Sequence, residues 1–143
     1  MNEREDRAPS AIDVSGVSKT YEEGRIRALD DLHLHVAAGE YVALVGPSGC
    51  GKSTLLHLIA ALDRPDEGSI VVADHDLAHE HDLSHYRARH VGMVFQLHNL
   101  LPTLTALENV EMPMFELGIR SSERERRARH LLELVGMAER ERN

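Results

Sequence analysis

A glycine-rich segment with one lysine carries the strongest chemical signal in this sequence. Gly46 and Gly51 enclose four residues, and Lys52 and Ser53 follow, which fits the phosphate-loop pattern G-x-x-x-x-G-K-[ST]. Glycines let backbone N–H groups converge on phosphate oxygens in conformations that side chains would forbid. Lys52 can reach terminal phosphates, and the Ser53 hydroxyl is a ligand that Mg²⁺ accepts. The alternative is a glycine-rich turn with a solvent-facing lysine.

The segments on either side of this loop are those that a phosphate loop needs. The apolar run 42–45 is rich in β-branched residues and predicts a buried strand that ends at the loop. The apolar residues from Leu55 to Leu62 have helical spacing and predict a helix that begins directly after it. The positive N-terminal end of that helix would favour bound phosphate. The sequence from 41 to 62 therefore predicts strand, phosphate loop and helix.

Alternating apolar residues predict further strands around this unit. They indicate an edge strand through residues 12–17, a turn over 19–24, a half-exposed antiparallel strand over 28–36, and short strands at 69–73 and 91–95. A polar, histidine-rich segment with a short helix at 83–89 separates the last two strands. Gln96 would then lie at the carboxyl end of a strand, where ligands bind in open α/β sheets.

The last third of the chain is predicted to be helical. Thr105 and Glu108 have the spacing of a capping box, and Pro113 should bend or end the helix that they open. Ser122 and Glu125 have the same spacing and predict a second helix. Gly136 follows the apolar face of that helix, at the position of a C-terminal cap.

Composition narrows the class of protein. The 143 residues are 42% hydrophobic and 28% charged, which is typical of one soluble globular domain. Sixteen basic and 24 acidic residues give a net charge of −8, which argues against a nucleic-acid-binding surface. No apolar run reaches the length of about 18 residues that a membrane span needs. Cys50 is the one cysteine and cannot form an internal disulfide, so we expect a cytoplasmic protein.

Several separated blocks, in a fixed order, resemble the ATP-binding subunit of an ABC transporter. They lie at 17–21, 39–44, 46–54, 62–68, 92–96 and 100–110, and are most similar to the group that includes lipoprotein-releasing, macrolide-export and division-associated ATPases. The resemblance implies an α/β fold of the P-loop NTPase, ABC ATPase type, with an antiparallel β subdomain and a helical subdomain. On this reading, residues 1–10 are a disordered leader, 11–96 the β subdomain and P-loop core, and 97–143 the helical subdomain.

The resemblance also implies roles for individual residues. Tyr21 corresponds to the aromatic residue that stacks on adenine, and Gln96 to the glutamine that reaches Mg²⁺ or the attacking water. Lys52 and Gln96 are then the catalytic residues, with Ser53 and Gln96 as magnesium ligands. The implied nucleotide-binding residues are Tyr21, Gly46, Pro47, Ser48, Gly49, Cys50, Gly51, Lys52, Ser53 and Thr54. Taken alone, Tyr21 would be an exposed turn tyrosine and Gln96 a surface residue.

Other motifs of the resembled family are not found in these 143 residues. They are the signature loop, the Walker B aspartate with its catalytic glutamate, and the switch histidine. We therefore expect the N-terminal part of a longer protein, without its C-terminal core strands, that binds Mg-ATP but hydrolyses it only as the intact parent. The implied partners are transmembrane permease subunits and, in the parent, a head-to-tail second copy, which would place it on the inner face of the cell membrane.

Four alternatives stay open at this point. The chain could be a non-catalytic nucleotide-binding or regulatory module, or a small P-loop kinase whose phosphate-clamping arginines lie at 120–129. Tyr21 and Gln96 argue against the kinase. The histidines between 75 and 90 could bind a metal, although a solvated polar segment is the simpler interpretation. The Cys50 thiol could be activated by the anion-binding loop, or could simply be small enough to fit there.

Overall fold

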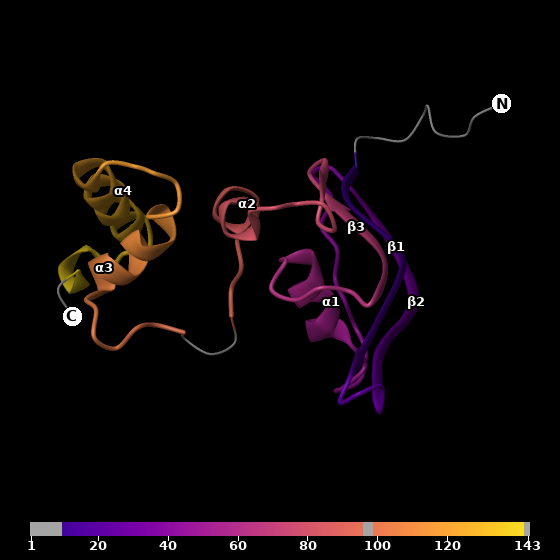
Figure 1. Cartoon of the computed structure of the whole chain (residues 1–143). Coiled ribbons are helices and arrows are strands. Elements are labelled where there is room, and N and C mark those ends of the chain that lie inside the picture. The colour runs from indigo at the N-terminus through magenta and orange to yellow at the C-terminus, as the bar shows by residue number, and fades with distance from the viewer. Residues whose placement is uncertain (1–9, 96–98, 142–143) are drawn as a thin grey trace. The chain divides into compact units, whose positions relative to one another are not determined.

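The computed structural model describes residues 10–95 and 99–141, so the predicted leader lies almost entirely outside the described residues. The chain divides into two compact units, Met1–Leu83 and Ser84–Asn143. Figure 1 shows the order of their helices and strands. The boundary expected from the sequence, between residues 96 and 97, falls inside the second unit. No helix in the described ranges is both long enough and apolar enough to cross a bilayer.

The first unit is built on a four-stranded antiparallel sheet. Its strands are β1 (Ser10–Tyr21), β2 (Ile26–Ala37), β3 (Glu67–Val72) and β4 (His75–Asp76), in the order β2-β1-β3-β4. The predicted edge position of the first strand is wrong, because β1 pairs with β2 on one side and β3 on the other. The predicted turn over 19–24 is also too early. Lys19 and Thr20 still pair with Leu29 and Arg27 of β2.

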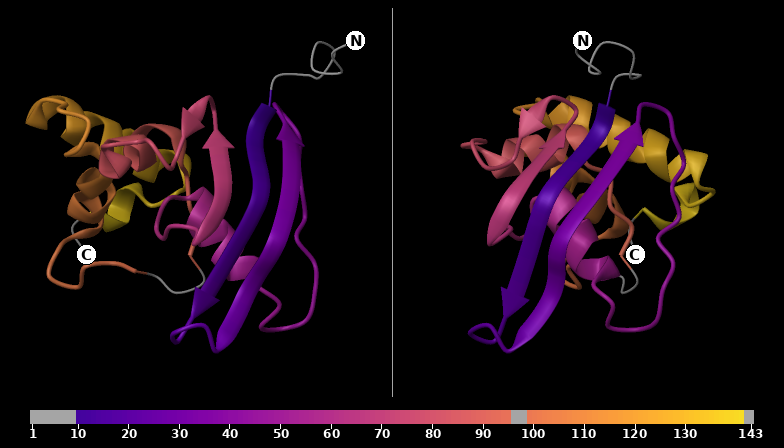
Figure 2. Two further views of the ribbon diagram at one scale, coloured as in Figure 1. Left: turned by 45° about the vertical axis from the view of Figure 1, so that its right-hand side comes forward. Right: turned by 90° about the vertical axis from the view of Figure 1, so that its right-hand side faces the viewer.

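One face of this sheet supplies the core of the first unit. Val14 and Val17 of β1, Leu29 and Val36 of β2, and Ile70 and Val72 of β3 are buried. Helix α1 (Lys52–Ile59) lies against the sheet, as both views of Figure 2 show, and buries Leu55 and Leu58. Ile70 and Val72 alternate along β3, but the buried positions of β1 and of β2 are three and seven residues apart, because irregularities in the β1–β2 pairing shift the register. The predicted helix after the loop is therefore confirmed, and sheet packing fixes its place.

Two predicted strands are wrong. Residues 40–47 and 91–95 form neither helix nor strand, and several of their apolar side chains face solvent: Tyr41 is 96% exposed, Val45 89% and Val94 99%. An apolar run becomes a buried strand only when strands on both sides satisfy its N–H and C=O groups. The described parts of the chain offer no strand that pairs with either run.

The second unit is helical. It contains most of α2 (Leu83–His90), α3 (Ala106–Glu111), the 3₁₀ turn η1 (Met112–Met114), α4 (Ser121–Leu134) and the turn η2 (Ala138–Arg140). Helices α3 and α4 pack together, with Ala128 and Leu132 of α4 buried. The Asn109 carboxamide donates to the carbonyls of Leu101, Leu104 and Thr105. These bonds fasten the segment before α3 to the helix.

The helix ends test the capping predictions individually. Thr105 and Glu108 form the expected capping box, and α3 gives way to a 3₁₀ turn at Pro113. The second box is wrong: Ser122 lies inside α4, Arg120 is the N-cap, and its side chain makes no capping bond. Gly136 has φ of 71° and ends α4 as predicted, with its N–H on the Glu133 carbonyl and the Met137 N–H on the Leu132 carbonyl.

Candidate functional site

The glycine-rich loop ends at a close contact with strand β2. Gly51 caps α1 with φ of 91°, and a Cβ atom there would lie 2.4 Å from the backbone oxygen of Ala28. Only glycine permits both that conformation and that approach. Strand β2 thus determines where the loop turns into α1. The sequence pattern alone does not indicate this contact.

The Lys52 ammonium closes the loop on itself. Its Nζ donates to the carbonyl oxygens of Gly46, at 2.8 Å, and Pro47, at 2.7 Å, and lies 3.5 Å from Cys50 Sγ. The Cys50 N–H donates to the Pro47 carbonyl at 3.4 Å, which tightens the turn. A positive charge is therefore held among the backbone atoms of the segment that the sequence predicts to surround phosphate.

The first turn of α1 points unpaired donors into the same region. The first intrahelical bond of α1 runs from the Leu55 N–H to the Gly51 carbonyl, and Gly51 has no side chain to cap the turn. The preceding N–H groups, from Lys52 to Thr54, therefore have no partner within the helix. Ser53 is exposed and Thr54 half-buried beside them. Backbone donors, a helix N-terminus and an ammonium together suit a polyphosphate.

Tyr21 is not an exposed turn residue. It is the last residue of β1, half-buried, and its hydroxyl donates to Asp63 Oδ2 at 3.0 Å. Burial raises the pKa of Tyr21, the bond to Asp63 raises it further, and a hydrogen bond with the Thr54 side chain lowers it in part. Since Thr54 belongs to the first turn of α1, the structure brings the predicted adenine platform next to the predicted phosphate loop.

Sequence reasoning missed the residues that hold Tyr21. Lys19, two positions earlier on β1, donates to Asp63 Oδ1 at 3.0 Å and to the Arg64 carbonyl at 2.7 Å. Asp66 accepts from both the N–H and the hydroxyl of Thr20. A signal was present: Lys19 takes the next position after Val17 on the buried face of an alternating strand, where a charge needs a partner.

The position of Gln96 is not settled by the geometry. It is one of residues 96–98, which lie outside the described residues, so its predicted roles in catalysis and magnesium binding remain predictions. Residues 91–95 before it are described, but they form neither helix nor strand and belong to no sheet. The site that the structure brings together therefore consists of the loop, the start of α1, and Tyr21 with its partners.

Comparison with known proteins finds relatives that match most of this chain. Residues 29–143 match the ABC transporter family. An ABC transporter ATP-binding protein of Thermotoga maritima is 47% identical over 90% of this chain and 57% of its own length. The lipoprotein-releasing system ATP-binding protein LolD of Geobacter metallireducens is 45% identical over 92% of this chain and 60% of its own.

This chain belongs to the ABC transporter family. A solved structure agrees with that assignment: the ATP-binding cassette MJ0796, in a dimeric post-hydrolysis state bound to ADP and Pi, has a TM-score of 0.81 and 40% identity over 92% of this chain and 60% of that one. The predicted α/β fold of the ABC ATPase type is thereby confirmed. The chain spans only about three fifths of the length of these relatives.

In this ABC family member, two histidines of the histidine-rich segment lie beside carboxylates. His75 Nδ1 lies 2.9 Å from Glu80 Oε2, and His79 Nδ1 lies 2.9 Å from Asp76 Oδ2. Among the described residues, no three His, Cys, Asp or Glu side chains come together in a way that could hold a metal ion. Carboxylates beside His75 and His79 agree with the reading as a polar surface segment.

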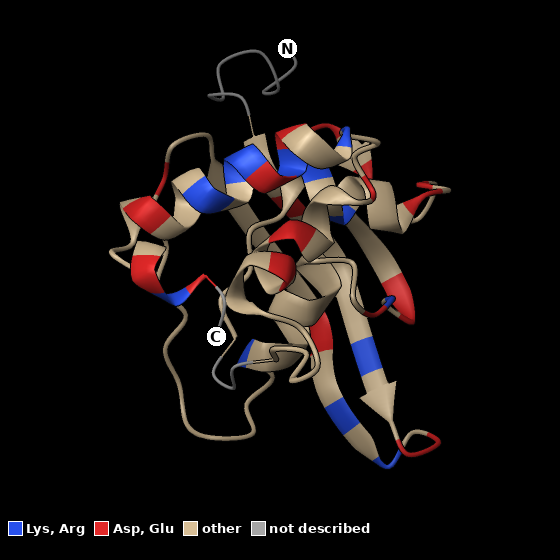
Figure 3. Cartoon of the chain, turned by 90° about the vertical axis from the view of Figure 1, so that its left-hand side faces the viewer, with Lys and Arg blue, Asp and Glu red and all other residues tan. Residues whose placement is uncertain are grey.

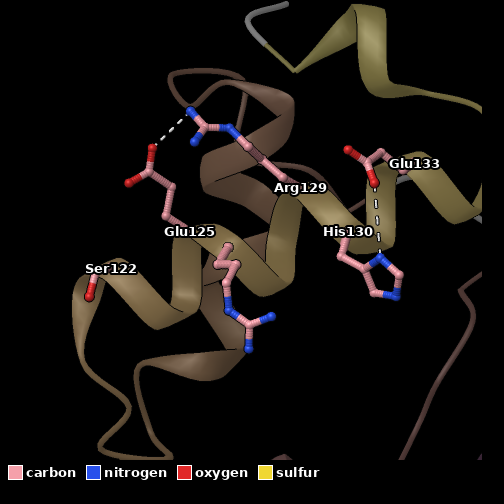
Figure 4. Close-up of a pocket in the computed structure, with 6 residues that line it drawn as sticks. Ser122, Glu125, Arg129, His130 and Glu133 are labelled. Carbon is pink, nitrogen blue, oxygen red and sulfur yellow. Dashed lines mark ion pairs between the residues drawn. The ribbon is translucent and has the colours of Figure 1, made fainter.

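The arginines of α4 are engaged by carboxylates. A shallow pocket on this helix is lined by Ser122, Glu125, Arg126, Arg129, His130 and Glu133, and Figure 4 shows the pairs Glu125–Arg129 and His130–Glu133. Arg126 and Arg127 both bind Glu123. Figure 3 shows basic and acidic residues interleaved along α4. Interleaved charges of this kind suit an exposed helix face.

Proposed function

We propose that this chain binds ATP, with Mg²⁺, as the ATP-binding subunit of an ABC transporter. The observation that carries the proposal is the convergence of three groups at one loop. The Lys52 ammonium and the uncapped first turn of α1 meet beside Gly46 and Gly51. Thr54 of that turn reaches Tyr21. Family membership and the nucleotide named with the similar cassette support the same ligand.

Each group of the loop has a distinct task in this proposal. The N–H groups of residues 52–54 and the helix end bind phosphate oxygens, while Lys52 exchanges a loop carbonyl for the terminal phosphates. The ring of Tyr21 stacks on adenine, an interaction worth about 1–3 kcal/mol. Ser53, and Gln96 by resemblance, would hold Mg²⁺, which neutralises charge that develops on the phosphates.

The proposed partners follow from the family. Several relatives are ATP-binding components of a lipoprotein-releasing system, and the similar cassette is dimeric. We propose that the protein works with transmembrane permease subunits on the inner face of the membrane and pairs head to tail with a second copy.

The test is a calorimetric titration of the 143-residue chain with Mg-ATP. Lys52→Ala should weaken binding by about 10- to 100-fold, because a charge-assisted hydrogen bond to phosphate is lost. Arg25→Ala, which removes an exposed cation from the turn between β1 and β2, should leave the affinity unchanged. Wild-type chain that binds no Mg-ATP would refute the proposal. Robust phosphate release that depends on Lys52 would refute the expected lack of turnover.

A further inference from the structure

A buried ammonium lies beside the proposed adenine platform. Lys19 is 9% exposed and is the one charged residue that is buried in the ranges described. Its Nζ donates to Asp63 Oδ1 and the Arg64 carbonyl and lies 3.6 Å from Asp66 Oδ1. Burial would lower the pKa of Lys19, but the hydrogen bond and charge of Asp63, with the charge of Asp66, raise it overall. Lys19 is therefore a fixed positive charge at neutral pH.

Asp63 joins this charge to Tyr21 through its two oxygens. Oδ1 accepts from Lys19 at 3.0 Å, and Oδ2 accepts from the Tyr21 hydroxyl at 3.0 Å. The Arg64 N–H also donates to Oδ1, at 2.7 Å. Burial would raise the pKa of Asp63, but these three donors outweigh it and hold the pKa below its usual value. The carboxylate thus stays ionised, and its orientation is determined from both sides.

The ring of Tyr21 is held at its hydroxyl and on one face. The Lys19 ammonium lies over the ring, 5.3 Å from its centroid, so a flat ligand must stack on the opposite face. The hydroxyl is held by Asp63 and by Thr54 of α1. Four side chains therefore connect the end of β1 with the first turn of the helix that follows the phosphate loop.

We propose that Asp63 is a positioning residue for the nucleotide base. It orients the Tyr21 ring, with Lys19 behind it, so that adenine and phosphates are bound at a fixed separation. The proposal rests on the function proposed above and adds a residue that acts through Tyr21. Asp66 supplies the contrast: it also lies 3.6 Å from Lys19, but its hydrogen bonds run to the N–H and hydroxyl of Thr20 and to the Ser18 carbonyl, and not to Tyr21.

The experiment compares two ligands on the full chain: Mg-ATP, and inorganic tripolyphosphate with Mg²⁺, which lacks the base. Asp63→Asn should weaken Mg-ATP binding by about two- to tenfold, the effect of one weakened hydrogen bond, and leave tripolyphosphate binding unchanged. Tyr21→Phe, which removes only the hydroxyl, should likewise weaken Mg-ATP binding and leave tripolyphosphate binding unchanged. The double variant should bind Mg-ATP no more weakly than the weaker single variant, since both substitutions act on the same contact between Asp63 and Tyr21. Asp66→Asn should leave the ratio of the two affinities as in the wild type.

Equal weakening of both ligands by Asp63→Asn, or the same change of ratio in Asp66→Asn, would overturn the proposal in favour of a purely structural turn contact. If Asp63→Asn does not fold, Tyr21→Phe still decides: an unchanged affinity ratio would overturn the proposal. Failure of the proposed function looks different. In that case the wild-type chain binds neither ligand, whereas here it binds both and only the ratio is at issue.

Discussion

Gly51 is the residue at which the glycine-rich loop contacts the sheet. Because its φ is 91° and a Cβ would meet the Ala28 carbonyl oxygen, Gly51→Ala should lower the free energy of unfolding by about 3 kcal/mol or more. Gly49→Ala is the matched control. Gly49 has φ of 82° but open space around it, so the cost should be about 1 kcal/mol. Urea unfolding measures both, and equal costs would contradict the contact with β2.

Single residues also show where sequence reasoning reached the site and where it stopped. The loop from Gly46 to Thr54 was predictable, because its chemistry depends on neighbours in sequence. The Lys19–Asp63 pair was not, since its members are 44 positions apart and meet only after α1 has packed on the sheet. The alternation of β1 indicates that Lys19 is buried, but only the structure shows that Asp63 is its partner.

At the scale of the helix, the two capping patterns make a direct test. Thr105→Ala should destabilise the second unit by about 1 kcal/mol, because Thr105 accepts from the Glu108 N–H and pairs with its carboxylate. Ser122→Ala, at the same pattern position but inside α4, should cost no more than a few tenths of a kcal/mol. Hydrogen exchange of the Glu108 amide provides a local measure. Equal losses of stability in the two variants would show that the sequence spacing, and not the capping geometry of the structure, determines what each residue contributes.

The charge arrangement on α4 predicts a pH dependence. Hydrogen bonds from Arg126, and then from Arg127, lower the pKa of Glu123 from 4.5 to about 2. Because the pKa of Glu123 is lower in the folded state than in the unfolded chain, its carboxylate stabilises the helix at pH values above the unfolded pKa. This contribution is lost as the pH falls through about 2. A carboxyl ¹³C titration should therefore place the Glu123 midpoint near pH 2. Replacing both arginines by glutamine should move it back towards 4.5, and a wild-type midpoint above pH 4 would contradict the bonds.

The helices and strands differed in how well local sequence predicted them. Strands β1 and β2 are joined by a turn of four residues and α1 follows its loop directly, so periodicity and adjacency were enough. The runs 42–45 and 91–95 have the composition of buried strands, but a strand also requires partners. No described strand lies beside either run, so local preference alone could not make them part of a sheet.

At the scale of the whole molecule, exposed apolar side chains should govern behaviour in solution. We expect marginal stability, binding of hydrophobic dyes and concentration-dependent association, because Val45 and Val94 lie almost fully in solvent. Val45→Thr and Val94→Thr should reduce light scattering without lowering the free energy of unfolding. Val17→Thr, at a fully buried position, should instead cost about 1–3 kcal/mol. A sharp two-state urea transition with no dye binding would contradict this prediction.

The contact between Lys52 and the loop carbonyls has a further consequence for how a ligand would be received. A free lysine side chain has many rotamers, and fixing one at a binding interface costs about 0.5–1.5 kcal/mol. Here the Gly46 and Pro47 carbonyls already hold the ammonium, so most of that ordering is completed during folding. An arriving phosphate replaces a neutral acceptor with a charged one, and the lysine does not first have to be brought in from solvent.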